Sequence, residues 1–202
     1  IIATTATVLC ICVAIPAAYS FARHNYRGKN LVMVCILLCN MIPQASTLVP
    51  LYRAMDRLQI IDTHFGIAFT HLLCMLPFSI IMLKGFIRTI PPTLEEAAMI
   101  DGCTKLQAIF KIIVPVCSSG IFATAMYAFM ISWEEFLYAM TFSTSSRART
   151  ISIGLKMFST EFKVDWSSIL AAATLMTLPI LILFFMIQDT FIKGATNGAL
   201  KE

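Results

Sequence analysis

Charged residues are scarce in this sequence. Only 13% of its 202 residues are Asp, Glu, Lys or Arg, and 58% are apolar, whereas soluble domains carry about 25% charged residues. The mean hydropathy is +0.82. These values argue against a water-soluble globule. The 15 basic residues are spread over the connectors instead of forming one basic tract, so we expect no nucleic-acid partner.

Motifs for catalysis, metal binding and disulfide frameworks are also missing. There is no phosphate-binding G-x-x-x-x-G-K-[ST] and no H-E-x-x-H. His24 lies in a basic connector, and His64 and His71 lie two turns apart in one predicted helix. For those two, packed or interfacial histidines are favoured over a metal pair, because no carboxylate or cysteine completes a ligand set nearby. Of the seven cysteines, only Cys103 lies in a polar connector, which argues against a disulfide framework. We expect no enzyme, no metal site and no cofactor bound by this chain.

The chain lacks an initiator Met and a basic region ahead of its first apolar run. Ile1 already stands inside that run, unlike the start of a signal peptide. We therefore expect that N-terminal elements, including a further span, precede Ile1 in the complete protein.

Long charge-free runs dominate what is present. About 20 apolar residues in a helix cross a hydrocarbon core of roughly 30 Å, and five runs are long enough to do so. The sequence predicts an all-α integral membrane protein with five helical spans in the runs 1–22, 30–52, 63–83, 112–133 and 166–188.

The basic residues of the connectors predict the orientation. An odd number of spans sorts the connectors onto two faces, and cytoplasmic loops carry the excess of Lys and Arg. Six basic residues fall on one face, and nine fall on the other: Arg23, Arg27, Lys29, Lys84, Arg88, Lys105, Lys111, Lys193 and Lys201. The richer face is predicted to be cytoplasmic, which also places the C-terminus inside.

The connector from 84 to 111 is too orderly for a passive link. Thr93 stands three residues before Glu96, and Thr104 three before Gln107, which is capping-box spacing. Gly102 follows the first apolar segment and can take the left-handed conformation that ends a helix. The pattern predicts a cytoplasmic helix-turn-helix.

The first of these two helices has features of a docking surface. Glu95 and Glu96 lie near the positive end of its dipole, and Ala97 and Ala98 allow close approach. An interfacial helix that joins two spans and binds nothing is the alternative interpretation.

The run from Glu96 to Gly102, E-A-A-M-I-D-G, followed by Pro115, resembles the E-A-A loop of permease subunits of bacterial ABC importers. Further matches extend over the whole chain, among them Met41-Ile42-Pro43 and Trp133 to Leu137, and are similar to the carbohydrate-uptake branch of that family. The resemblance implies a permease domain over 1–202, with about six spans in the complete protein and a coupling loop at 84–115.

The resemblance also implies function, location and partners. It implies a multi-pass subunit in the bacterial plasma (inner) membrane that imports a sugar or sugar derivative by alternating access. The implied partners are a second permease subunit, cytoplasmic ATPase subunits that use the ATP, an extracytoplasmic substrate-binding protein and membrane lipid. The residues expected to couple the ATPase to the spans are Glu95, Glu96, Ala97, Ala98, Asp101, Gly102 and Pro115.

A second group of residues is expected to line the solute path: Asn40, Gln44, Trp133, Glu134 and Glu135. Acids within spans are costly and tend to mark pathways, although an interfacial pair capped by water is an alternative interpretation. Glu134 departs from the family pattern, which usually has Asn there. The alternative function is an ion-coupled secondary transporter or channel subunit, which needs no docking loop for a separate motor.

Overall fold

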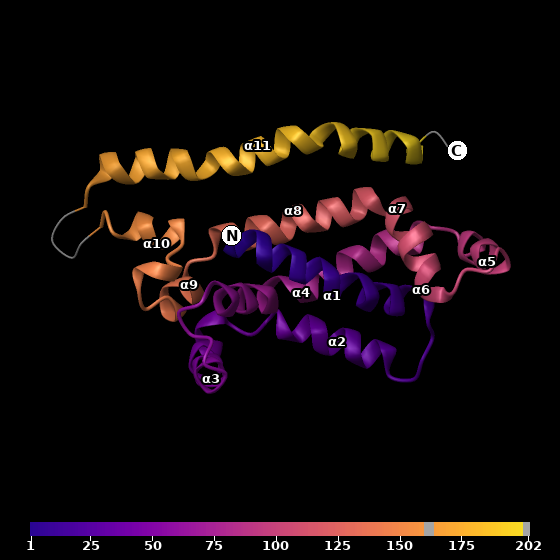
Figure 1. The fold of residues 1–202 in the computed structure, drawn as a ribbon, viewed down its shortest axis with the longest axis horizontal. Coiled ribbons are helices and arrows are strands. Elements are labelled where there is room, and N and C mark those ends of the chain that lie inside the picture. The colour runs from indigo at the N-terminus through magenta and orange to yellow at the C-terminus, as the bar shows by residue number, and fades with distance from the viewer. Residues whose placement is uncertain (160–163, 200–202) are drawn as a thin grey trace. The chain divides into compact units, whose positions relative to one another are not determined.

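The computed structural model describes residues 1–159 and 164–199, with side chains described as far as residue 185. Almost all regular structure in these ranges is helical. The elements in chain order are α1 (Ile2–Arg23), α2 (Lys29–Cys39), α3 (Gln44–Arg57), α4 (His64–Thr89), α5 (Thr93–Ile100), α6 (Lys105–Ala108), the π-helix η1 (Ile109–Ile113), α7 (Val114–Val116), α8 (Ser118–Glu134), α9 (Leu137–Phe142), the 3₁₀ turn η2 (Ser146–Ala148), α10 (Ile151–Lys156) and α11 (Trp166–Ala199) (Figure 1).

Each of the five predicted spans is helical, but only three are single long helices. Those three are α1, α4 and α11, whose 20 residues Trp166–Phe185 have a mean hydropathy of 2.3. The other two runs are broken helix pairs, so the described residues contain three candidate spans, or five if each pair counts as one. An all-α membrane fold is confirmed, and two of the five predicted spans are broken into helix pairs.

The two breaks have local causes. In the run 30–52, α2 ends at Cys39 and α3 begins after Pro43, whose ring disfavours a helical residue before it and removes a backbone donor. In the run 112–133, the helix from Lys105 to Val116 and α8 meet at Cys117 with a bend of 79°. Pro115 lies just before that bend and cannot donate its backbone nitrogen.

The chain forms two compact units. Unit 1 comprises Ile1–Thr5, Pro43–His71 and Met130–Glu202, and unit 2 comprises Ala6–Ile42 and Leu72–Phe129. Unit 1 is held partly by α3 on α9, where the rings of Tyr52 and Phe142 stack with centroids 6.1 Å apart. Unit 1 also joins the connector before α4 to the end of α9, because the backbone N–H of Asp62 donates to the Phe142 carbonyl at 2.9 Å.

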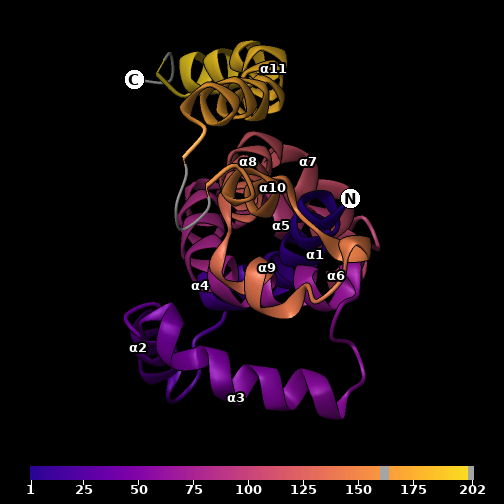
Figure 2. The same cartoon turned by 90° about the vertical axis from the view of Figure 1, so that its left-hand side faces the viewer.

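Unit 2 has a core made by α1, α4 and η1, and α1, α4 and α8 run beside one another (Figure 2). Its fully buried side chains include Leu83 and Ile113. Gly120 lets α8 approach α4, because a Cβ at this position would overlap the ring of Phe86. This apolar packing holds α1, α4 and η1 together, and α5 contacts η1.

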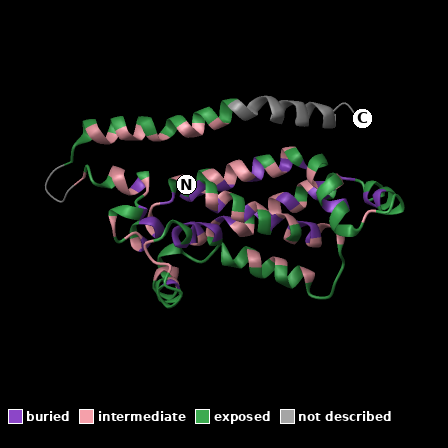
Figure 3. Cartoon of the chain, viewed as in Figure 1, coloured by how far each residue is buried: buried purple, intermediate pink, exposed green. Residues whose placement is uncertain are grey.

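The outer surfaces of two helices are apolar and uncovered. Every residue of α2 and every residue from 166 to 185 in α11 is exposed or half-buried (Figure 3). Large apolar side chains on them, such as Leu31 and Leu175, are 68% and 66% exposed. Such surfaces suit a lipid environment or contact with other membrane helices.

Candidate functional site

The connector after α4 folds into the helix-turn-helix that the sequence predicts. The first helix, α5, spans Thr93–Ile100 and contacts α6 and η1. Gly102 ends it with φ +88°: its backbone N–H donates to the Met99 carbonyl, and that of Cys103 donates to the Ala98 carbonyl. This pair of bonds is the Schellman arrangement, so the predicted left-handed glycine is confirmed.

Of the two predicted capping boxes, one forms. Thr104 caps α6 by accepting from the backbone N–H of Gln107, whose side chain accepts from the backbone N–H of Thr104. The predicted box of Thr93 and Glu96 is wrong. Pro92 already has helical dihedral angles, so Thr93 lies inside the first turn and the N-cap position has no side-chain bond.

Glu95 points into the protein and ties α5 to α1. Only 7% of Glu95 is exposed. Its Oε1 accepts from Nε of Arg23 at 2.5 Å, and its Oε2 accepts from the hydroxyl of Tyr19 at 2.7 Å. The same guanidinium donates through Nη2 to the Ile90 carbonyl at 2.7 Å. One buried carboxylate therefore connects the last turn of α1 to the first turn of α5.

The remaining predicted coupling residues divide between the two sides of α5. Ala98 is buried, whereas Glu96, Ala97, Asp101 and Gly102 are exposed. Pro115 is exposed in α7, beyond η1. The exposed residues lie along the outer side of the helix and at its end. Two of them, Glu96 and Asp101, are carboxylates, and neither forms an ion pair with a described residue.

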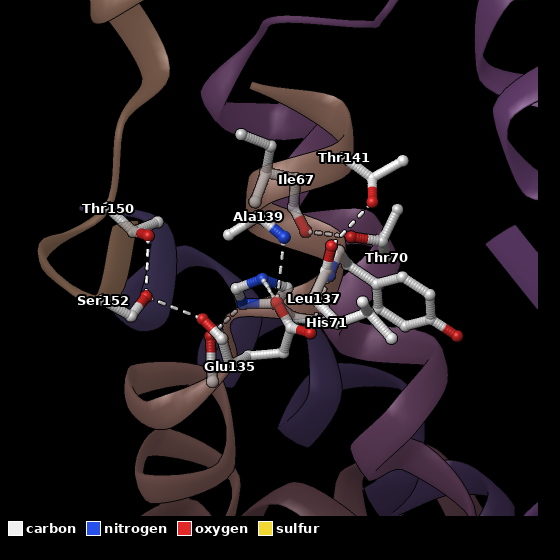
Figure 4. A network of polar contacts seen from close by, with 11 residues as sticks. Ile67, Thr70, His71, Glu135, Leu137, Ala139, Thr141, Thr150 and Ser152 are labelled. Atoms are coloured by element: carbon white, nitrogen blue, oxygen red, sulfur yellow. Dashed lines mark hydrogen bonds and ion pairs between the residues drawn. The ribbon is translucent and has the colours of Figure 1, made fainter. Parts of the chain in front are cut away.

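Glu135 is the second buried acid, and it sits at the break between α8 and α9. Its Oε1 accepts from the backbone N–H of Tyr138 at 2.8 Å, and its Oε2 from that of Ala139 at 3.0 Å. These donors belong to the first turn of α9, which has no carbonyl partners for them. Figure 4 shows this carboxylate beside the imidazole of His71.

His71 completes a buried polar network in unit 1. The residue is fully buried; its Nε2 lies 3.1 Å from Oε2 of Glu135, and its Nδ1 lies 2.7 Å from the hydroxyl of Ser132. The Nε2 contact fits an ion pair by distance but is poorly aligned for a hydrogen bond. Ser152 extends the network by donating to the Glu135 carbonyl at 2.8 Å (Figure 4).

The predicted path residues have different surroundings. Asn40 and Gln44 are exposed, at the C-cap of α2 and the start of α3. Trp133 is half-buried, and its Nε1 donates to the Met176 carbonyl at 3.1 Å. Glu134 is exposed, in contrast to its buried neighbour Glu135.

A cavity of about 210 Å³ lies in unit 1 beside Trp133. Its wall combines apolar, hydroxyl, imidazole, indole and guanidinium groups. The lining residues are Ile1, Ile2, Ala3, His64, Ser132, Trp133, Arg149, Thr150 and Ile151. Of the five predicted path residues, Trp133 alone belongs to this set.

Three residues that position these sites are absent from the predicted coupling and path sets: Arg23, Tyr19 and His71. The sequence indicated Arg23 only as a marker of orientation and His71 only as a packed or interfacial histidine. A signal for Arg23 was available, because a basic residue in the last turn of an apolar helix must leave the hydrocarbon or find a partner.

Several membrane permeases are similar to this chain in sequence. The chain is 35% identical to the sulfoquinovosyl glycerol transport permease SmoH of Agrobacterium fabrum over 200 residues, covering 99% of this chain and 70% of the relative. It is 32% identical to the trehalose/maltose permease MalG of Thermococcus litoralis, with 100% and 73% covered. It is 30% identical to the diacetylchitobiose permease DasC of Streptomyces coelicolor, with 100% and 73% covered.

Residues 11–197 match the model of the binding-protein-dependent transport system inner membrane component, and the chain belongs to that family. It is therefore a multi-pass membrane permease of an ABC importer. A crystal structure of a bacterial ABC transporter that imports the acidic polysaccharide alginate shares its fold, with a TM-score of 0.78 over 94% of this chain and 71% of that one, at 19% identity.

Proposed function

We propose that this chain imports a sugar or sugar derivative by alternating access, in a complex with a second permease subunit. Cytoplasmic ATPase subunits bind and hydrolyse the ATP, and an extracytoplasmic binding protein supplies the solute. The names of the relatives support this substrate class, since they specify transport of sugars or sugar derivatives. The C-terminus lies in the cytoplasm, on the same side as α5.

The main support for the coupling role is that the two sides of α5 have different surroundings. Glu95 faces inward and binds Arg23 of α1, while Glu96 and Ala97 face outward. A push or pull on the exposed side is transmitted through the buried ion pair to a membrane-spanning helix. A helix that merely joins two spans needs no such anchor, so this geometry favours docking over the passive alternative.

The rest of the helix-turn-helix supports the same role. Next to α5, the apolar side chains of Ile90, Ile109 and Ile113 pack into the core with Leu83 and Ile87 of α4. Close packing transmits displacement because interiors have little free volume. The segment therefore moves with α1 and α4 as one body when the exposed face is displaced.

Uptake by the complete importer tests this function. Proteoliposomes that contain both permeases and the ATPase subunits, supplied with the binding protein, are loaded with ATP or with a non-hydrolysable analogue. We expect uptake of radiolabelled sugar with ATP only, unchanged by an ionophore that collapses ion gradients. Uptake that needs an ion gradient and ignores ATP would support the alternative of an ion-coupled carrier.

Labelling in intact cells tests the orientation. The exposed Ser146 of η2 and the exposed Lys105 of α6 are each replaced by Cys, and a membrane-impermeant maleimide is added. We expect labelling above the parent level at position 146 in intact cells, and at position 105 only after permeabilisation. The reverse pattern contradicts a cytoplasmic α5.

A further inference from the structure

Among the described residues that line the cavity beside Trp133, Arg149 has a side chain that is always charged. Arg149 is exposed, and its Nη1 contacts Sδ of Met157 at 3.5 Å. The ion pairs among described residues are Arg23–Glu95 and His71–Glu135, so Arg149 is not paired with any described carboxylate. A guanidinium offers a planar fork of donors that matches carboxylate, sulfonate or phosphate oxygens.

The two glutamates closest in sequence do not neutralise this charge. Glu134 and Glu135 follow Trp133 directly, but neither lines the cavity. The carboxylate of Glu135 is directed to the α9 amides of Tyr138 and Ala139 and to His71. The cavity therefore favours an anion over a cation.

The other walls suit a sugar ring. Trp133 supplies an indole, and Ile2 and Ile151 supply apolar surface for the C–H faces of a ring. Ser132, Thr150 and His64 supply hydrogen-bonding groups for hydroxyls.

The cavity also touches the buried network at two hydroxyls. Ser132 is bonded to His71 at 2.7 Å. Thr150 is bonded to Ser152 at 2.8 Å, and Ser152 donates to the Glu135 carbonyl. A bound solute that shares either hydroxyl acts on the groups that cap α9.

From these observations we propose that Arg149 and Trp133 form a subsite for an anionic group carried on a sugar, such as a uronate or a sulfonated sugar. Arg149 pairs with the acidic substituent, and Trp133 lies against the ring. The inference rests on the proposed import of sugars and specifies the charge of the solute.

Paired substrates test the subsite. Uptake is measured in proteoliposomes of the complete importer with each neutral sugar and its uronate counterpart, including methyl glucoside with methyl glucuronide and a disaccharide with its aldobiouronic acid. The variants are Arg149→Gln, Arg149→Lys and, as the matched control, Arg147→Gln, which is exposed two residues away and outside the cavity.

We expect Arg149→Gln to lower the uptake of the acidic sugars relative to the neutral ones by about tenfold, the size of one charge-assisted hydrogen-bonding contact. Arg149→Lys should retain part of the preference, and Arg147→Gln all of it. The melting temperature of Arg149→Gln should match the parent, because Arg149 is exposed. Equal loss for both solutes, or no loss, overturns the subsite.

Further outcomes distinguish a lipid phosphate from the solute as the bound anion, and failure of the subsite from failure of the proposed substrate class. If the Arg149→Gln effect depends on phosphatidylglycerol in the vesicles and not on the charge of the solute, the guanidinium binds a lipid phosphate and the solute subsite is overturned. If the parent importer moves neutral sugars only, the subsite fails while sugar import stands. If the parent moves no sugar, the proposed substrate class itself fails.

Discussion

Two pairs of sequence-adjacent glutamates, one in α5 and one at the end of α8, each have one buried and one exposed member. Glu95 and Glu135 are each 7% exposed, and their neighbours Glu96 and Glu134 are exposed. Adjacent residues on a helix point about 100° apart, which accounts for the pair in α5. Glu135 lies just beyond the end of α8 and turns inward to the amides of α9. In both places the buried acid accepts hydrogen bonds through both of its oxygens.

The partners of the two buried acids differ. Glu95 binds the guanidinium of Arg23, which is always charged and comes from a helix 72 residues away in sequence. Glu135 binds backbone N–H groups three and four residues ahead of it, with His71 alongside. The first acid is a long-range link between two helices, whereas the second is mainly a local cap that sets the start of α9.

The largest expected effect comes from breaking the long-range link. Arg23→Leu leaves Glu95 charged and buried, and removing one partner of a buried pair costs about 3–5 kcal/mol. We expect the melting temperature of the purified importer to fall and ATP hydrolysis to become uncoupled from uptake.

Arg27→Leu is the matched control, since Arg27 is exposed four residues further on, and it should leave both measurements unchanged. Replacing both partners, as Arg23→Leu with Glu95→Leu, should recover part of the stability but not the coupling. Parental stability in Arg23→Leu alone would show that the pair is not a link.

A smaller effect is expected at the local cap. Glu135→Gln removes the charge and one acceptor oxygen while keeping the shape, which leaves a buried α9 amide without its partner and costs about 1–3 kcal/mol. Thermal unfolding measures the loss. Glu134→Gln, the exposed neighbour, should have no effect on unfolding. Equal losses of stability in Glu135→Gln and Glu134→Gln would contradict the capping role of Glu135.

The turn after α5 gives a third test, now of the backbone. Gly102 has φ +88°, so Gly102→Ala places a Cβ in the left-handed region at a cost of about 1–2 kcal/mol. Gly85→Ala is the control, because a Cβ there meets no atom within 4 Å and its φ lies outside the positive range. Gly85→Ala should be neutral or slightly stabilising. The comparison fails if both glycines tolerate alanine equally.

The smallest effect concerns a half-buried acid in the connector before α4. Oδ1 of Asp62 accepts from the backbone N–H groups of Ser145 and Thr144, both at 3.0 Å. Hydrogen bonding to Ser145, helped by Thr144 and Arg147, lowers the pKa of the Asp62 carboxyl below its ordinary value.

Because the folded-state pKa is lowered, the stabilisation is complete above the ordinary pKa of about 3.9 and is lost as the pH falls through the folded value. The melting temperature of Asp62→Asn should lie slightly below the parent's at pH 7, and the gap should close on acidification. A difference in melting temperature between the parent and Asp62→Asn that widens at low pH would contradict the lowered pKa of Asp62.

The membrane helices could be read from the sequence, because a bilayer demands about 20 apolar residues per span. The breaks could not, since Pro43 and Pro115 are compatible with either a kink or a full interruption. Local signals at Gly102 and Thr104 predicted the helix-turn-helix because they act within a few residues. The inward turn of Glu95 depended on Arg23 and Tyr19, which no local pattern connects to it, and the failed cap at Thr93 depended on the dihedral angles of Pro92.

The most direct test of the different roles of Glu95 and Glu96 compares the variants Glu96→Gln and Glu95→Gln of the complete importer in proteoliposomes. Transport-stimulated ATP hydrolysis and thermal unfolding are measured for each variant. Glu96→Gln should unfold at the parent temperature yet lose about tenfold of the stimulated hydrolysis, the size of one charge-assisted contact. Glu95→Gln should unfold at a lower temperature. A Glu96→Gln importer that keeps the parental rates of uptake and stimulated hydrolysis would contradict a docking role for the exposed face of α5.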